Sequence, residues 1–163
     1  MLVFLLLSAA GAIGSDQPAG ACALLAPDEI AGVQGAPPVQ ARPSEHADGG
    51  LVAQQCFYLL PDPVRSVSLE VRRPGPRSNQ RALRRRWREM MRAKDDDDAP
   101  GSAGARSVPG LDRPALWTGT PKAGSLYVLG VRAIVRVSVG GPAGVEAKIE
   151  ACKTLARRVL RRL

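Results

Sequence analysis

The chain has 163 residues, a length typical of one domain with its own buried core. Hydrophobic residues make up 45% of the chain but aromatic residues only 4%, so an aromatic-rich core is excluded and the core has to be aliphatic. The formal net charge of +8 favours contact with anionic lipids, polysaccharides or nucleic acid, although a basic surface also serves solubility alone.

The N-terminal segment MLVFLLLSAAGAIG is an apolar block that runs into small residues. It is shorter than the ~20 apolar residues that a membrane-spanning helix needs, so we expect no transmembrane span. The pattern is typical of a secretory signal peptide, here residues 1–14, with cleavage near Ser15. Signal peptides carry a basic residue before the apolar block, and none precedes it here, so we expect that the true start lies upstream. We therefore expect a secreted or periplasmic protein in which residues 15–163 form a single domain.

The three cysteines allow several kinds of site. Lipid attachment to Cys22 is an open alternative, because the small tripeptide AGA precedes it, although the polar segment SDQP separates it from the apolar block. A metal site needs several ligands at short spacing, and the sequence has no C-x-x-C pair and a single histidine, His46. A catalytic thiol would need that histidine as its partner. We therefore predict a disulfide between Cys22 and Cys56, as oxidising compartments permit, and neither metal nor cofactor.

The first half of the domain predicts a helix followed by strands. In LLAPDEIAGVQG, Pro27 suits a first helical turn, Asp28 and Glu29 suit its positive end, and Gly35 suits its stop. The next stretch, APPVQARPSEHADGG, contains several prolines and glycines and predicts a loop or an edge strand. LVAQQCFYLL and SVSLEV predict an antiparallel pair of strands, because apolar and polar residues alternate in the second segment.

The segment SNQRALRRRWREMMRAK predicts a central amphipathic helix with Ser78 as its cap. The expected apolar stripe comprises Leu83, Trp87, Met90 and Met91. The opposite, basic face comprises Arg81, Arg84, Arg85, Arg88 and Arg92. Four consecutive aspartates oppose the helix dipole at its C-terminus, so residues 95–106 predict an acidic, glycine-rich loop.

The second half predicts strands and a final helix. SLYVLGVRAIVRVSVGG is typical of a hairpin with Gly130 at its turn, and Pro142 opens the last helix. Cys152 lies on the apolar stripe of that helix, which favours a free thiol in the core and leaves an intermolecular bridge as the alternative.

The element order is roughly α-β-β-α-β-β-β-α. It predicts an α+β fold in which an antiparallel sheet of about five or six strands packs its apolar face against helices.

Several short segments occur in an order known from other proteins: CALLAPDEIAGVQG, QCFYLL, SVSLEV, VPGLDRPALW, LYVL and VSVGG. Together they resemble small secreted bacterial proteins and lipoproteins of unknown function whose domain opens C-x-L-L-T-x-x-E-(V/I)-x-x-x-x-G. In that family a second cysteine follows in a strand, then a G-L-G-D-x-A turn and an aliphatic hairpin. This chain departs from the pattern at Ala26, at residues 111–113 and at residues 130–133. The resemblance implies pairing of Cys22 with Cys56 and an exported location, but it implies no catalytic residues.

Three classes of function follow from these observations. We expect first a non-enzymatic, envelope-associated binding module, because the sequence has no nucleophile–base pair, metal set or phosphate-binding loop. The alternative is binding of an anionic lipid or polysaccharide by the basic face of helix 81–92; export makes nucleic acid a poor candidate. The third is an enzyme that uses Glu29, Glu70 or Asp112 as acid and base, although their spacing brings no two together. We expect a monomer.

Overall fold

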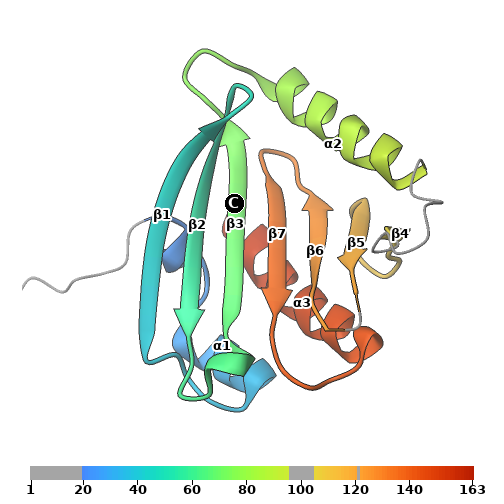
Figure 1. Cartoon of the computed structure of the whole chain (residues 1–163). Helices are drawn as coiled ribbons and strands as arrows, with labels where there is room; N and C mark the ends of the chain where they lie inside the picture. The colour runs from blue at the N-terminus through green and yellow to red at the C-terminus, as the bar shows by residue number, and fades with distance from the viewer. Residues whose placement is uncertain (1–19, 96–104, 121) are drawn as a thin grey trace, which may run out of the picture.

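The computed structural model describes residues 20–95, 105–120 and 122–163. Its elements are η1 (Gly20–Leu24), α1 (Pro27–Gln34), β1 (Gln40–Asp48), β2 (Leu51–Leu59), η2 (Pro63–Arg65), β3 (Val67–Pro74), α2 (Gln80–Asp95), β4 (Arg106–Ser107), β5 (Ala115–Gly119), β6 (Gly124–Leu129), β7 (Ile134–Val139) and α3 (Val145–Leu160). The strands form one antiparallel sheet in the order β1-β2-β3-β7-β6-β5-β4 (Figure 1). The expected α+β class is confirmed, but within the described residues the sheet has seven strands rather than five or six.

Local sequence patterns place several elements correctly. Helix α1 has Pro27 in its first turn and ends at Gly35, whose φ of 85° is the left-handed conformation that favours glycine at a helix end. Strands β2 and β3 pair antiparallel, and β6 and β7 form the expected hairpin with Gly130 in its turn. The last helix begins at Val145, three residues later than expected from Pro142.

For one strand the sequence leaves two alternatives, and a second strand is not predicted at all. The sequence of the first allows a loop or an edge strand, and the structure shows an edge strand, β1. All residues of β1 except Asp48 are exposed, so no alternation of buried and exposed residues marks it as a strand. Strand β4 has only two residues, and its first, Arg106, lies within the stretch expected to be a loop. At the other end of that stretch, Asp95 closes α2, and residues 96–104 lie outside the described part of the chain. The expected signal peptide and Ser15 also lie outside it.

The main core lies between the sheet and the helices behind it. In Figure 1, α1 and α3 lie behind the strands. Cys56, Leu69, Val137 and Leu126 are neighbours across four strands, and all four are fully buried. Helix α3 covers them with Ile149, Cys152, Leu155, Ala156 and Val159. The core expected from the composition is therefore built on this face; it is mainly aliphatic and also contains Tyr58 and Trp117.

Helix α2 packs on the opposite face, contrary to the expectation that all helices share one apolar face. Successive residues of a strand point to opposite faces, and Ile134 contacts the α2 side whereas Val135 belongs to the main core. The second cluster comprises Leu51, Ala82, Leu83, Trp87, Leu116 and Ile134, with Met90 and Met91 packed against it. The cap also differs from the expected Ser78: the Asn79 side chain accepts a hydrogen bond from the Arg81 N–H at 2.9 Å.

Candidate binding surface on helix α2

The basic face of α2 points into solvent. Its periodicity places Leu83 and Trp87 against the sheet, where their exposed fractions are 1% and 8%. The arginines at the other positions are all exposed: Arg81, Arg84, Arg85, Arg88 and Arg92. The structure therefore gathers the five arginines expected from the sequence on one surface, which we call the α2 arginine face.

Few acidic side chains in the described part of the chain pair with this surface. Residues 80–95 contain seven basic and two acidic side chains. Arg85 lies 3.9 Å from Glu89, an exposed pair that contributes little stability. Within the described residues, Arg81, Arg84 and Arg88 have no ion-pair partner. Among the described residues, Arg81, Arg84 and Arg88 thus present guanidinium groups that no carboxylate neutralises, and guanidinium groups bind phosphate, sulfate and carboxylate groups in bidentate geometry.

Arg86 is the one arginine of α2 that turns towards the sheet. Its guanidinium lies 3.8 Å from Asp48, and Asp48 accepts a hydrogen bond of 3.0 Å from Arg72. Arg72 in turn donates to Glu70 at 2.6 Å. The sequence does not predict this role of Arg86, because within RRR only its position between the two faces of the helix distinguishes it from its neighbours. This chain of ion pairs connects α2 to the sheet, the buried side chains Leu83 and Trp87 hold the helix there, and the arginine face stays exposed.

Trp87 does not share that free surface. Its side chain is 8% exposed and packs with Leu83, Leu116 and Ile134. A stacking role on a nucleic-acid base would need an open ring face. The structure therefore assigns Trp87 to the second core.

The three carboxylates considered for acid–base chemistry lie in separate places. Glu29, on α1, binds Arg162 at 2.6 and 2.9 Å, and this hydrogen bonding is the largest cause of its lowered pKa. Glu70, 1% exposed, lies on the α2 side of the sheet and accepts hydrogen bonds from Gln55 and Arg72. Asp112 is exposed in the loop before β5. Glu29 and Glu70 are bound by different partners and Asp112 is exposed to solvent, so the three carboxylates form no shared site among the described residues.

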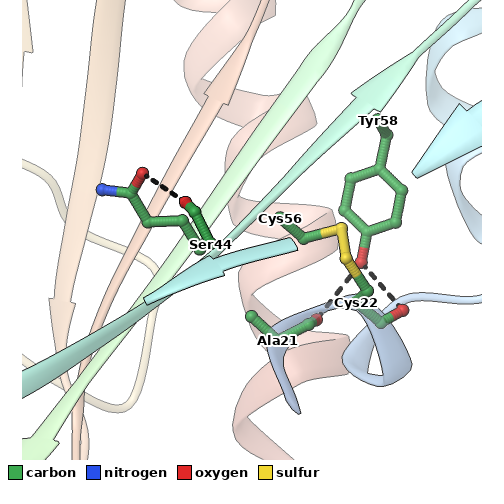
Figure 2. Close-up of a disulfide and its surroundings, with 6 residues drawn as sticks. Ala21, Cys22, Ser44, Cys56 and Tyr58 are labelled. Atoms are coloured by element: carbon green, nitrogen blue, oxygen red, sulfur yellow. Dashed lines mark hydrogen bonds between the residues drawn. A yellow bond between two sulfur atoms is a disulfide. The ribbon is translucent and has the colours of Figure 1, made fainter. Parts of the chain in front are cut away.

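The predicted disulfide between Cys22 and Cys56 is confirmed, with the Cα atoms 5.0 Å apart (Figure 2). It links η1 to the middle of β2, and Tyr58 strengthens the link by donating to the carbonyls of Ala21 and Cys22 at 3.3 and 3.2 Å. Burial raises the pKa of the Tyr58 hydroxyl, which keeps it a neutral donor. A sulfur in a disulfide cannot also carry a lipid thioether, so the lipid-anchor alternative does not apply to the disulfide-bonded protein.

The remaining cysteine and the histidine do not form a catalytic pair. Cys152 is buried in α3, and burial raises the pKa of its thiol to about 12. His46 lies exposed on β1, at the edge of the sheet. A neutral, enclosed thiol is a poor nucleophile. Over the three described ranges, there is also no group of three or more His, Cys, Asp or Glu side chains that could hold a metal ion.

The disulfide fits an extracellular location. None of the described helices is long and apolar enough to cross a membrane.

Scans against protein-family models, curated proteins and solved structures each found no match for this chain. The resemblance to small secreted bacterial proteins therefore remains an expectation from its short motifs, and function has to be argued from the residues themselves.

Proposed function

We propose that the protein is a secreted, non-enzymatic binding module of the cell envelope that holds anionic partners on the α2 arginine face. The observation that carries this proposal is the division of α2 into two sides. Leu83 and Trp87 are buried against the sheet, while the five arginines opposite them are exposed. A helix fixed on one side and charged on the other can present a rigid array of guanidinium groups.

The chemistry of this array suits a polymer or surface with repeated negative charges. Arg81, Arg85, Arg88 and Arg92 follow one another at steps of four, three and four residues, so they form one stripe along the helix. Each cation close to an anionic surface contributes about 1 kcal/mol, and the contributions accumulate along a stripe. Binding of this kind weakens steeply as salt is added, because counterions are released from the polymer.

Support for an envelope location comes from the disulfide and from the apolar N-terminal block. The disulfide suits an oxidising compartment, and residues 1–14 have the composition of a signal peptide. In that compartment the abundant polyanions are acidic polysaccharides and anionic lipids rather than nucleic acid.

Removing charge from the stripe tests the proposal. The double variant Arg81→Gln/Arg88→Gln should bind heparin, used as a model polyanion, about 30-fold more weakly at low salt, at roughly 1 kcal/mol for each cation. The matched control is Arg42→Gln/Arg65→Gln, which removes two other exposed arginines. Its affinity should change less than threefold. Equal losses in the two variants would show attraction by net charge alone, and absence of heparin binding in the parent protein would overturn the proposal.

A further inference from the structure

Four cavities meet around one exposed arginine, Arg113, at the end of the sheet where the β6–β7 hairpin turns. Their volumes are about 180, 350, 290 and 350 Å³, and Arg113 lines all four. The walls of three of them come from the start of α2, the loop before β5, the β6–β7 turn and the end of α3. The fourth lies between Trp87 and Met91 of α2 and the segment from Ser107 to Ala115. In Figure 1 that turn lies at the upper end of the sheet, close to α2.

Five arginines line these cavities, and we call them the arginine corner: Arg84, Arg113, Arg132, Arg157 and Arg161. Arg157 donates to the carbonyl of Gly110 at 2.7 Å. For the other four, the described part of the chain offers no ion-pair or hydrogen-bond partner to the guanidinium group. Of the described residues that line the four cavities, Asp112 is the one acidic residue. The corner is therefore strongly electropositive and adjoins the α2 arginine face at Arg84.

Aliphatic side chains lie between these charges. Leu111, Leu160 and Leu163 line the cavities and pack against the edge of the main core, each partly buried. Val131, at the tip of the β6–β7 turn, is 65% exposed and precedes Arg132. Exposed apolar side chains surrounded by cations are typical of surfaces that touch lipid.

We propose that the arginine corner docks on an anionic phospholipid surface, with its guanidinium groups on the lipid phosphates and Val131 in the apolar boundary beneath them. This inference rests on the proposed function and narrows its anionic partner to a lipid. The charges alone would suit a polysaccharide equally well. The aliphatic residues decide for lipid, because a hydrophilic sugar polymer offers nothing to cover Val131, Leu160 and Leu163, whereas acyl chains do.

Vesicle sedimentation tests this assignment. The full chain should bind vesicles of phosphatidylglycerol and phosphatidylcholine, and it should bind at least tenfold more weakly to phosphatidylcholine alone. Val131→Asn should weaken binding to the anionic vesicles about fivefold without changing heparin affinity. Val64→Asn is the matched control, since Val64 is 67% exposed at η2 and lines none of the four cavities; it should change neither.

A second variant keeps the test independent of the valine. Arg113→Gln/Arg132→Gln should weaken vesicle binding at least tenfold and heparin binding less than threefold, with unchanged far-ultraviolet circular dichroism. Vesicle binding that is insensitive to both Val131 and this arginine pair would overturn the lipid assignment while heparin binding still supported the proposed function. If Arg113→Gln/Arg132→Gln weakened binding to vesicles and to heparin equally, the lipid assignment would also be overturned, because the arginine corner would then be a general anion-binding site. If the parent protein bound neither anionic vesicles nor heparin, the proposed function itself would be overturned.

Discussion

The two faces of the sheet are built from different chemistry. The face towards α3 is aliphatic across neighbouring strands, from Cys56 through Leu69 to Val137, and the disulfide joins it to η1. The face towards α2 holds a buried carboxylate, Glu70, between Arg72 and Arg136. We infer that the first face supplies most of the stability, whereas the second positions charge. Changes to the exposed arginines should therefore alter binding without unfolding the protein.

The largest effect is expected from removing the disulfide on the aliphatic face. Cys22 and Cys56 are 34 residues apart, and closing a loop of that size contributes about 4 kcal/mol in the chain-entropy model. Cys22→Ala/Cys56→Ala should lower the free energy of unfolding, measured with urea, by about that amount. Cys152→Ala, which leaves the disulfide intact, is the control and should cost clearly less. A loss below about 1 kcal/mol in the double variant would show that the disulfide is not a main support of this face.

A matched pair of leucines compares the two faces directly. Leu69 is completely buried in the main core, and Leu83 is 1% exposed beneath α2. Leu→Ala at a buried position costs about 2–5 kcal/mol, depending on how well the surroundings collapse into the cavity. We expect about 4 kcal/mol for Leu69→Ala and about 2 kcal/mol for Leu83→Ala, because α2 is packed on one side alone and can shift. Urea unfolding measures both, and equal or reversed costs would contradict the assignment of stability to the α3 side.

Helix α2 also illustrates what sequence can and cannot predict. Its amphipathic period identifies Leu83 and Trp87 as buried and the arginines as exposed, because that pattern is local. The same period does not say which face of the sheet the apolar stripe covers, so it does not predict that α2 packs on the face opposite α3. The exposed side chains of β1 do not distinguish a loop from an edge strand, whereas β3, β6 and β7 bury every second residue on one face of the sheet, a pattern that predicts strands.

The candidate site shows the same limit. The α2 arginine face lies within one helix and follows from spacing. In the arginine corner, Arg113, Arg132 and Arg161 come from a loop, a turn and the end of the chain. No sequence window contains all three, so only the tertiary fold brings them together.

A smaller effect is expected at Glu29, whose carboxylate binds Arg162 beside the main core. Its pKa is lowered in the folded protein, chiefly by that hydrogen bond. The stabilisation is therefore present above the unfolded pKa, about 4.5, and is lost as the pH falls through the lower folded value. Glu29→Gln should cost about 1 kcal/mol at pH 7, since Arg162 is 40% exposed to solvent, and less at pH 3.

Urea midpoints at pH 7 and pH 3 measure the effect of Glu29→Gln. The control is Glu146→Gln, because the Glu146 side chain is 79% exposed. It should change stability little at either pH. A cost for Glu29→Gln that is the same at both pH values would contradict the electrostatic origin of the stabilisation.

The salt dependence of heparin binding tests the central claim most directly, because it counts the arginines that touch the polyanion. The logarithm of the binding constant should fall linearly with the logarithm of the salt concentration, by roughly 0.7–0.9 for each neutralised anion. We predict that the slope of Arg81→Gln/Arg88→Gln is shallower than that of the parent protein by between about 1 and 2, with the free energy of unfolding unchanged to within about 0.5 kcal/mol. An unchanged slope would contradict the account, since it would mean that the α2 arginine face does not contact the polyanion.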